Sequence, residues 1–135
     1  MDDLEFLKSR IPNFATYEDE RNRHLADKHV RAFVGETLAV IRQRLEGEFS
    51  EELSAQLERI MLRCEFSEPK FASAIQGPLS REDLDRLYGA DRALLEDAIT
   101  IAGDALSGAH DDLVKRLADL EQHFDRRASI LHPWV

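Results

Sequence analysis

The longest regular pattern in this sequence lies in its C-terminal part, where no proline occurs between Ser80 and Ala128. Apolar residues recur there every three or four positions, a spacing that places them along one side of a helix. The residues of this stripe are Leu84, Tyr88, Leu95, Ala98, Ala102, Leu106, Leu113, Leu117, Leu120 and Phe124. Because such a stripe has to be covered, we expect this chain to pack helices against one another.

The rest of the chain is consistent with the same fold class. No segment shows the alternating apolar and polar residues of a strand, and no Asn-Gly or Asp-Gly pair indicates a hairpin. A chain of 135 residues, 43% of them hydrophobic, has room for one core. We therefore predict a single all-α domain over residues 1–135, an up-and-down bundle of about four to six helices with two of them long.

Capping residues and helix breakers give the expected boundaries. Thr16, Ser50 and Ser80 are suitable N-caps, and Pro12 and Gly47 are suitable stops. The predicted elements are a lead helix over 3–11, a long helix over 16–46, helices over 50–65, 68–76, 81–106 and 110–129, and a non-helical tail over 130–135. The break near Gly108 divides the last long stretch, and one continuous helix is the alternative.

The expected buried face of the helix over 16–46 follows the same spacing. Its residues are Leu25, His29, Val30, Phe33, Val34, Leu38, Ile41 and Leu45. The stretch from Tyr17 to Glu36 is also unusual for a helix surface, because it mixes an aromatic residue, acids, bases and histidines. This mixture indicates a specific role that the sequence does not define.

Charge limits the classes of partner. The formal net charge is −9, and an acidic surface repels phosphate backbones and anionic lipid. No apolar run approaches the length of a membrane-spanning helix, and the N-terminus lacks the apolar core of a signal peptide. We therefore expect a cytoplasmic protein that binds neither nucleic acid nor membranes. The single cysteine, Cys64, is expected to be a buried thiol.

Small residues gather in two segments. Ala32, Gly35 and Ala39 form one set, and the other lies within residues 98–109. We expect these segments to cross each other, with a ligand pocket or a self-association surface as alternatives. Gly35 and Ala39 are accordingly interface candidates, together with Leu131 and Trp134 in the tail, where an apolar side chain has to find a docking surface.

Polar residues provide few candidates for chemistry. His24, Asp27 and His29 are candidate metal ligands, but the two histidines are five positions apart and do not share one helix face. Asp104 and His110 are further candidates for a ligand site. No glycine-rich phosphate loop or nucleophile motif occurs, so no catalytic residue and no cofactor are expected.

The leading hypothesis from the sequence is a non-enzymatic bundle that acts through protein–protein contacts, as a homodimer or with a protein partner. Its long apolar stripes exceed what a thin bundle needs, and a symmetric partner would cover them. The alternative is a bundle that binds a small ligand or a metal through inward-facing His and Asp residues, with an enzymatic role possible in that case only.

Overall fold

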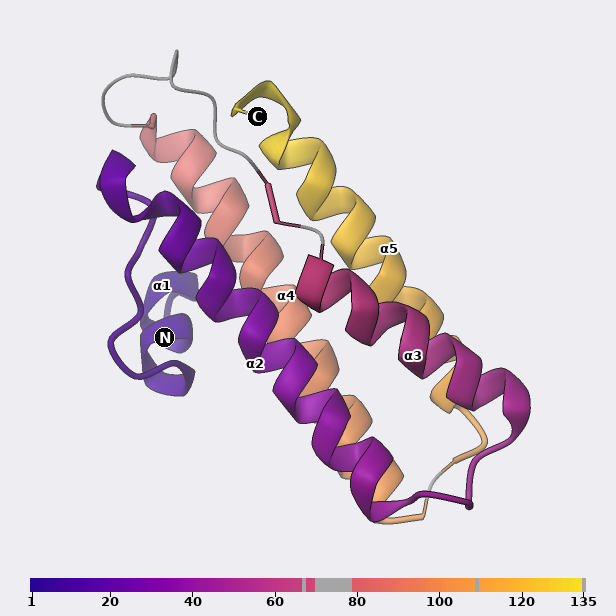
Figure 1. The fold of residues 1–135 in the computed structure, drawn as a ribbon. Helices are drawn as coiled ribbons and strands as arrows, with labels where there is room; N and C mark the ends of the chain where they lie inside the picture. The colour runs from indigo at the N-terminus through magenta and orange to yellow at the C-terminus, as the bar shows by residue number, and fades with distance from the viewer. Residues whose placement is uncertain (67, 70–78, 109, 135) are drawn as a thin grey trace.

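The structure is a computed structural model that describes residues 1–66, 68–69, 79–108 and 110–134. These residues form five α-helices and two short 3-10 turns, and they contain no strand. The helices are α1 (Asp3–Arg10), α2 (Arg23–Arg44), α3 (Glu51–Phe66), α4 (Arg81–Leu106) and α5 (Leu113–Leu131). The prediction of an all-α helical bundle is confirmed (Figure 1).

The four longer helices run alternately up and down (Figure 1). α2 packs against α3 and α4, and α5 packs against α3 and α4, so that α2 and α5 lie diagonally across the bundle. The short helix α1 packs against α4. Within the described residues, no helix has both the length and the apolar content needed to cross a membrane.

Side-chain caps explain where three of the helices begin. The Asp2 carboxylate accepts the backbone N–H of Glu5 at 2.7 Å, and the Glu5 side chain accepts the N–H of Asp2 in return, which completes a capping box. Ser80 Oγ accepts the N–H of Asp83 at 3.1 Å and begins α4. α4 covers the expected range of 81–106, and α3 begins after Ser50, whose Oγ accepts the N–H of Leu53 at 3.2 Å.

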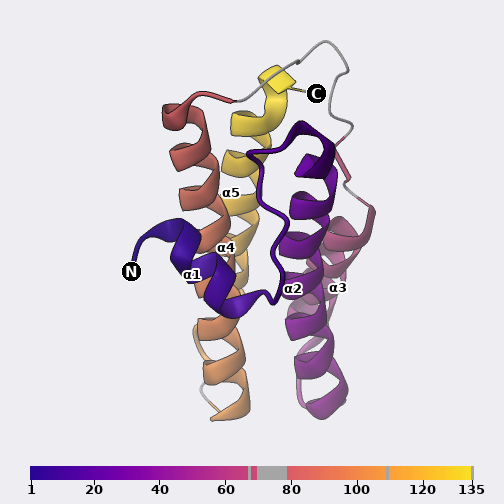
Figure 2. The same ribbon diagram turned by 90° about the vertical axis from the view of Figure 1, so that its left-hand side faces the viewer.

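The predicted start of the long helix at Thr16 is wrong. Thr16 has a positive φ of 60°, so it cannot begin a right-handed helix, and α2 starts only at Arg23 after a 3-10 turn over Glu20–Asn22. The Asp19 side chain caps that turn by accepting the N–H of Arg21. Residues before the turn instead form a loop that runs between α2 and α4 (Figure 2).

This loop is held down by side chains from both neighbouring helices. The backbone N–H of Tyr17 donates to the Tyr88 hydroxyl at 3.1 Å, and Arg23 Nε donates to the Tyr17 carbonyl at 3.1 Å. Phe14 and Tyr17 are buried, and their rings meet edge to face with the centroids 6.1 Å apart. The loop therefore covers the core where a longer α2 was expected.

The prediction for the C-terminal tail is also wrong. The tail was expected to be non-helical, but α5 continues to Leu131 and His132–Trp134 form a 3-10 turn. Trp134 is half-buried against the core of its own bundle. The predicted helix over 68–76 falls largely on residues outside the described part of the chain.

The buried face of α2 is rotated from the predicted one at its N-terminal end. Leu25 is 38% exposed, whereas Asp27 and Arg31 are buried. The predicted positions Val30, Val34, Leu38 and Ile41 are buried as expected. The reason for the rotation is a set of charged side chains in the interior, which Asp27 and Arg31 help to form.

Candidate functional site

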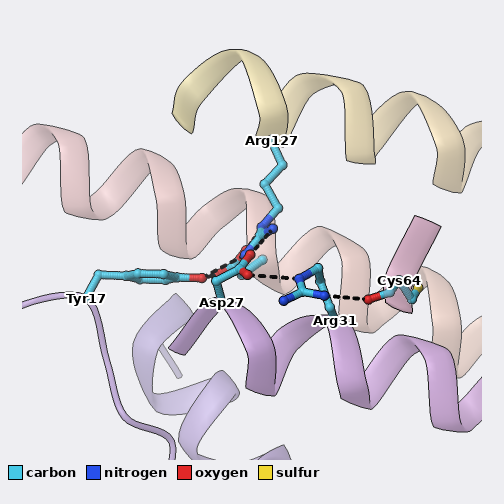
Figure 3. A network of polar contacts seen from close by, with 6 residues as sticks. Tyr17, Asp27, Arg31, Cys64 and Arg127 are labelled. Carbon is cyan, nitrogen blue, oxygen red and sulfur yellow. Dashed lines mark hydrogen bonds and ion pairs between the residues drawn. The ribbon is translucent and has the colours of Figure 1, made fainter. Parts of the chain in front are cut away.

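Charged side chains lie in the interior of the bundle near the end where α2 begins and α3 and α5 end, and burial requires that they be paired. Asp27 and Asp91 are fully buried, and Arg31 and Arg127 are 5% and 3% exposed. Together with the hydroxyl of Tyr17 and the carbonyl of Cys64 they form one set of contacts, called here the interior network (Figure 3). It joins the loop before α2 with α2, α3, α4 and α5.

Arg127 connects three of these groups. Its Nε donates to Asp91 Oδ1 at 2.6 Å, and its Nη2 donates to the Tyr17 hydroxyl at 2.9 Å. Its Nη1 forms an ion pair with Asp27 Oδ1 at 2.7 Å, although without the alignment of a hydrogen bond. Since α2 and α5 lie diagonally across the bundle, the long Arg127 side chain spans the core that separates them.

Tyr17 and Arg31 complete the interior network on either side. The Tyr17 hydroxyl donates to Asp91 Oδ2 at 2.5 Å. Arg31 Nε donates to Asp27 Oδ2 at 2.8 Å, and Arg31 Nη1 donates to the Cys64 carbonyl at 2.7 Å. That carbonyl lies in the last turn of α3, where the helix dipole also favours a positive charge.

Burial changes the acid–base properties of these groups. Burial, followed by the charge of Asp91, raises the pKa of Tyr17 well above its usual value. Burial also raises the pKa of Asp91, because the loss of hydration outweighs the attraction of Arg127. For Arg127, burial alone would lower the pKa, but the neighbouring Asp91, Tyr17 and Asp27 raise it well above its ordinary value.

The groups of the interior network are buried and bond mainly to one another, although Arg31 and Arg127 also line surface pockets. A buried arrangement of this kind contributes little net stability but is costly to break. We infer that this network fixes how the loop before α2 packs with α2, α3, α4 and α5. A site that contacts other molecules has to lie at the surface above it.

Such a surface lies between α2 and α3, directly outside Arg31. It is a groove with a volume of about 320 Å³. The residues that line this α2–α3 groove are Lys28, Arg31, Ala32, Gly35, Glu36, Ala39, Met61, Cys64 and Glu65. Its floor is apolar and its rim is charged, the composition expected for a protein-binding groove.

The small residues of α2 explain how the groove is formed. A Cβ atom added at Gly35 would lie 3.2 Å from Cys64 Cβ, so glycine allows α2 and α3 to approach closely at this point. Gly35 therefore meets α3 rather than the small-residue segment of α4, while α2 and α4 also pack against each other, so the predicted crossing of the two segments stays a prediction. A Cβ added at Gly103 would meet nothing within 4 Å, so this glycine makes no comparable close contact.

The outer row of α2, defined here as Lys28, Ala32 and Glu36, carries one charge on either side of Ala32. Lys28, Ala32 and Glu36 are exposed and lie at intervals of four residues along the same side of the helix. Neither Lys28 nor Glu36 forms an ion pair with any residue that the structure describes. The exposed Leu25 and the half-exposed Ala39 lie seven residues on either side of Ala32.

The structure does not bring the four predicted interface residues together. Gly35 and Ala39 line the α2–α3 groove. Leu131, the last residue of α5, is 4% exposed, and Trp134, in the 3-10 turn that follows, is half-buried; neither lines the groove.

The candidate metal ligands are also separate. Asp27 belongs to the interior network, His24 is exposed, and His29 Nδ1 accepts the backbone N–H of Ala15 at 3.4 Å. In the part of the chain that the structure describes, no group of three or more His, Cys, Asp or Glu residues is arranged to hold a metal ion.

The remaining polar candidates have local partners. Asp104 Oδ2 pairs with Arg116 Nε at 2.6 Å, and His110 Nε2 lies 3.0 Å from the Ala105 carbonyl. The lone thiol, Cys64, is buried, and burial raises its pKa to about 11. It is a poor nucleophile at neutral pH.

Two residues of the interior network were missed from the sequence. Asp91 lies between Leu87 and Leu95 on the buried side of α4, and Arg127 follows Phe124 on the buried side of α5. Both are charged residues at positions where the helical spacing predicts apolar ones, and this mismatch is the sequence signal that could have identified them.

Comparison of the chain with protein-family models, with curated proteins and with solved structures finds no match. The class of protein that the fold defines is an all-α helical bundle. Any more specific function has to be argued from the surface itself.

Proposed function

We propose that this protein is a non-enzymatic helical bundle that acts through protein–protein contacts, and that it forms a homodimer through the outer row of α2 beside the α2–α3 groove. The observation that carries the proposal is the placement of unpaired Lys28 and Glu36 at equal distances from Ala32. Lys28 and Glu36 lie eight residues apart, about 12 Å along the helix, so they do not pair with each other within one chain but can pair across two copies.

The spacing selects an antiparallel arrangement. If two copies of α2 cross with a twofold axis at Ala32, each Lys28 lies opposite Glu36 of the second copy, about 6 Å from the axis on either side. Leu25 then lies opposite Ala39 of the second copy, which gives its exposed side chain an apolar neighbour. The small side chain of Ala32 allows the two helices to approach at the crossing point.

The forces expected across this surface are of two kinds. Each exposed ion pair adds little affinity, so the charges mainly select the partner and its direction. Burial of Leu25 and of the apolar groove floor supplies the attraction. A mismatch of charge nevertheless opposes association, because like charges placed opposite each other repel.

Charge reversal tests the proposal in solution by light scattering at micromolar concentration. We expect a mass of twice 15.5 kDa for the wild type. K28E places two acids opposite each other at both ends of the contact, and E36K places two bases there, so each should raise the dissociation constant at least about tenfold. The double variant K28E/E36K restores both pairs with exchanged signs and should dimerise again.

The matched control is K115E, which makes the same charge change at an exposed residue of α5. Its mass should equal that of the wild type. A wild type that remains monomeric, or a dimer that is equally stable in K28E and K115E, would show that the outer row of α2 is not the interface. Circular dichroism checks that every variant keeps its helix content.

A further inference from the structure

A second arrangement of polar residues lies on the other side of the bundle, where α4 and α5 run along each other (Figure 1). His123 Nδ1 contacts Asp97 Oδ2, and both residues are half-buried. Burial raises the pKa of Asp97, and the hydrogen bond with His123 opposes this shift. A carboxylate bound at Nδ1 fixes the ring orientation and directs Nε2 away from the pair.

His123 also lines a pocket with a volume of about 270 Å³. The pocket is lined by Asp85, Arg86, Gly89, Ala90, Ala93, His123 and Arg126. Three of its α4 residues, Gly89, Ala90 and Ala93, are small, which leaves space beside the imidazole. This volume suits a small molecule rather than a folded partner.

The lining of this pocket includes two arginines, Arg86 and Arg126, and one acid, Asp85, although the whole chain is acidic. Arg86 and Arg126 are exposed and form no ion pair with any described residue. The nearby Asp85 is already paired with Arg81, whose Nε lies 3.2 Å from Asp85 Oδ1. Two guanidinium groups without partners therefore lie beside a histidine that a carboxylate holds in place.

We propose that this pocket binds a small molecule that carries a phosphate monoester. Arg86 and Arg126 supply planar, charged N–H groups that match phosphate oxygens, and His123 supplies an Nε2–H donor when its ring is protonated. Asp97 is a positioning residue that holds the ring. Two guanidinium groups beside an imidazole suit the three terminal oxygens of a phosphate monoester better than the two oxygens of a carboxylate. The site lies on α4 and α5, so it is independent of the dimer contact proposed for α2.

Inorganic phosphate is the probe for this site, added to the full-length protein in a buffer without phosphate. The imidazole resonances of His123 are followed by nuclear magnetic resonance, and we expect a saturable shift. R86Q and R126Q should each weaken phosphate binding about tenfold, because each removes a charged donor. R44Q is the matched control, since Arg44 is an exposed arginine on α2 outside the pocket, and it should bind phosphate like the wild type.

Two results would contradict the proposed phosphate site. A shift that does not saturate, or one that R44Q and R126Q weaken equally, would mean only non-specific attraction of an anion to a surface. The D97N variant tests whether Asp97 positions His123 without being needed for folding. Its circular dichroism should be unchanged. The His123 imidazole resonances should move before phosphate is added, and the phosphate affinity should fall. Unchanged imidazole resonances in D97N would contradict the role of Asp97.

Discussion

Both faces of α2 carry an acid and a base, but among the described residues only the inward-facing pair has partners within the chain. Asp27 and Arg31 point inward, where each is paired within the chain. Lys28 and Glu36 point outward, and neither has a partner among the described residues. The inward charges therefore define how this chain packs on itself, whereas the outward charges are available to a second molecule. Arg31 lies at the boundary, since it belongs to the interior network and also lines the α2–α3 groove.

The largest expected effect on stability comes from removing Arg127 from the interior network. R127L leaves the buried carboxylates of Asp27 and Asp91 without their shared cation, and the free energy of unfolding should fall by about 3–5 kcal/mol. Urea unfolding followed by circular dichroism measures the loss. R126L is the matched control, because Arg126 is the exposed neighbour, and it should change the free energy by less than about 0.5 kcal/mol. Equal effects of the two variants would contradict the interior network.

A smaller effect is expected from Tyr17. Y17F removes the hydroxyl that donates to Asp91 and accepts from Arg127, and the free energy of unfolding should fall by about 1.5–3 kcal/mol. The same urea measurement applies. If Y17F were as stable as the wild type, the hydroxyl would not be needed to satisfy Asp91 and Arg127.

The pH dependence of stability gives the smallest of these effects. The folded chain holds the Tyr17 proton more tightly than the unfolded chain, because burial, followed by the charge of Asp91, raises the pKa of Tyr17 well above its usual value. The contribution of Tyr17 is therefore complete below pH 10 and is lost as the pH rises above it, by at most about 1.4 kcal/mol per pH unit. Thermal melts between pH 9 and pH 11 should show a steeper decline for the wild type than for Y17F. Parallel declines would contradict the assignment.

The sequence predicted the elements better than their contacts. Ser80 and the regular stripe that follows it gave the range of α4, because a cap and a helical period are local signals. The start of α2 could not be predicted in the same way. The positive φ of Thr16 results from the docking of Tyr17 into the core, which depends on Tyr88 and Asp91 more than seventy residues away.

The candidate site was predictable only in part. Tyr17, Asp27 and Arg31 lie in the stretch that looked unlike an ordinary helix surface, but nothing in the sequence pairs them with Asp91 or Arg127. Gly35 and Ala39 were identified from their size, whereas their partner surface on α3 was not. Pairing between distant segments follows from three-dimensional packing, and a single sequence does not encode it in a local pattern.

The most direct test of the central claim is the mass, by light scattering, of an equimolar mixture of K28E and E36K at micromolar concentration. In an antiparallel α2 contact, the mixture pairs the acids of one variant with the bases of the other at both ends. We predict that each variant alone has a mass of 15.5 kDa and that the mixture has twice that mass. A mixture that stays monomeric while the wild type dimerises would contradict the proposed contact between Lys28 and Glu36 of the second copy.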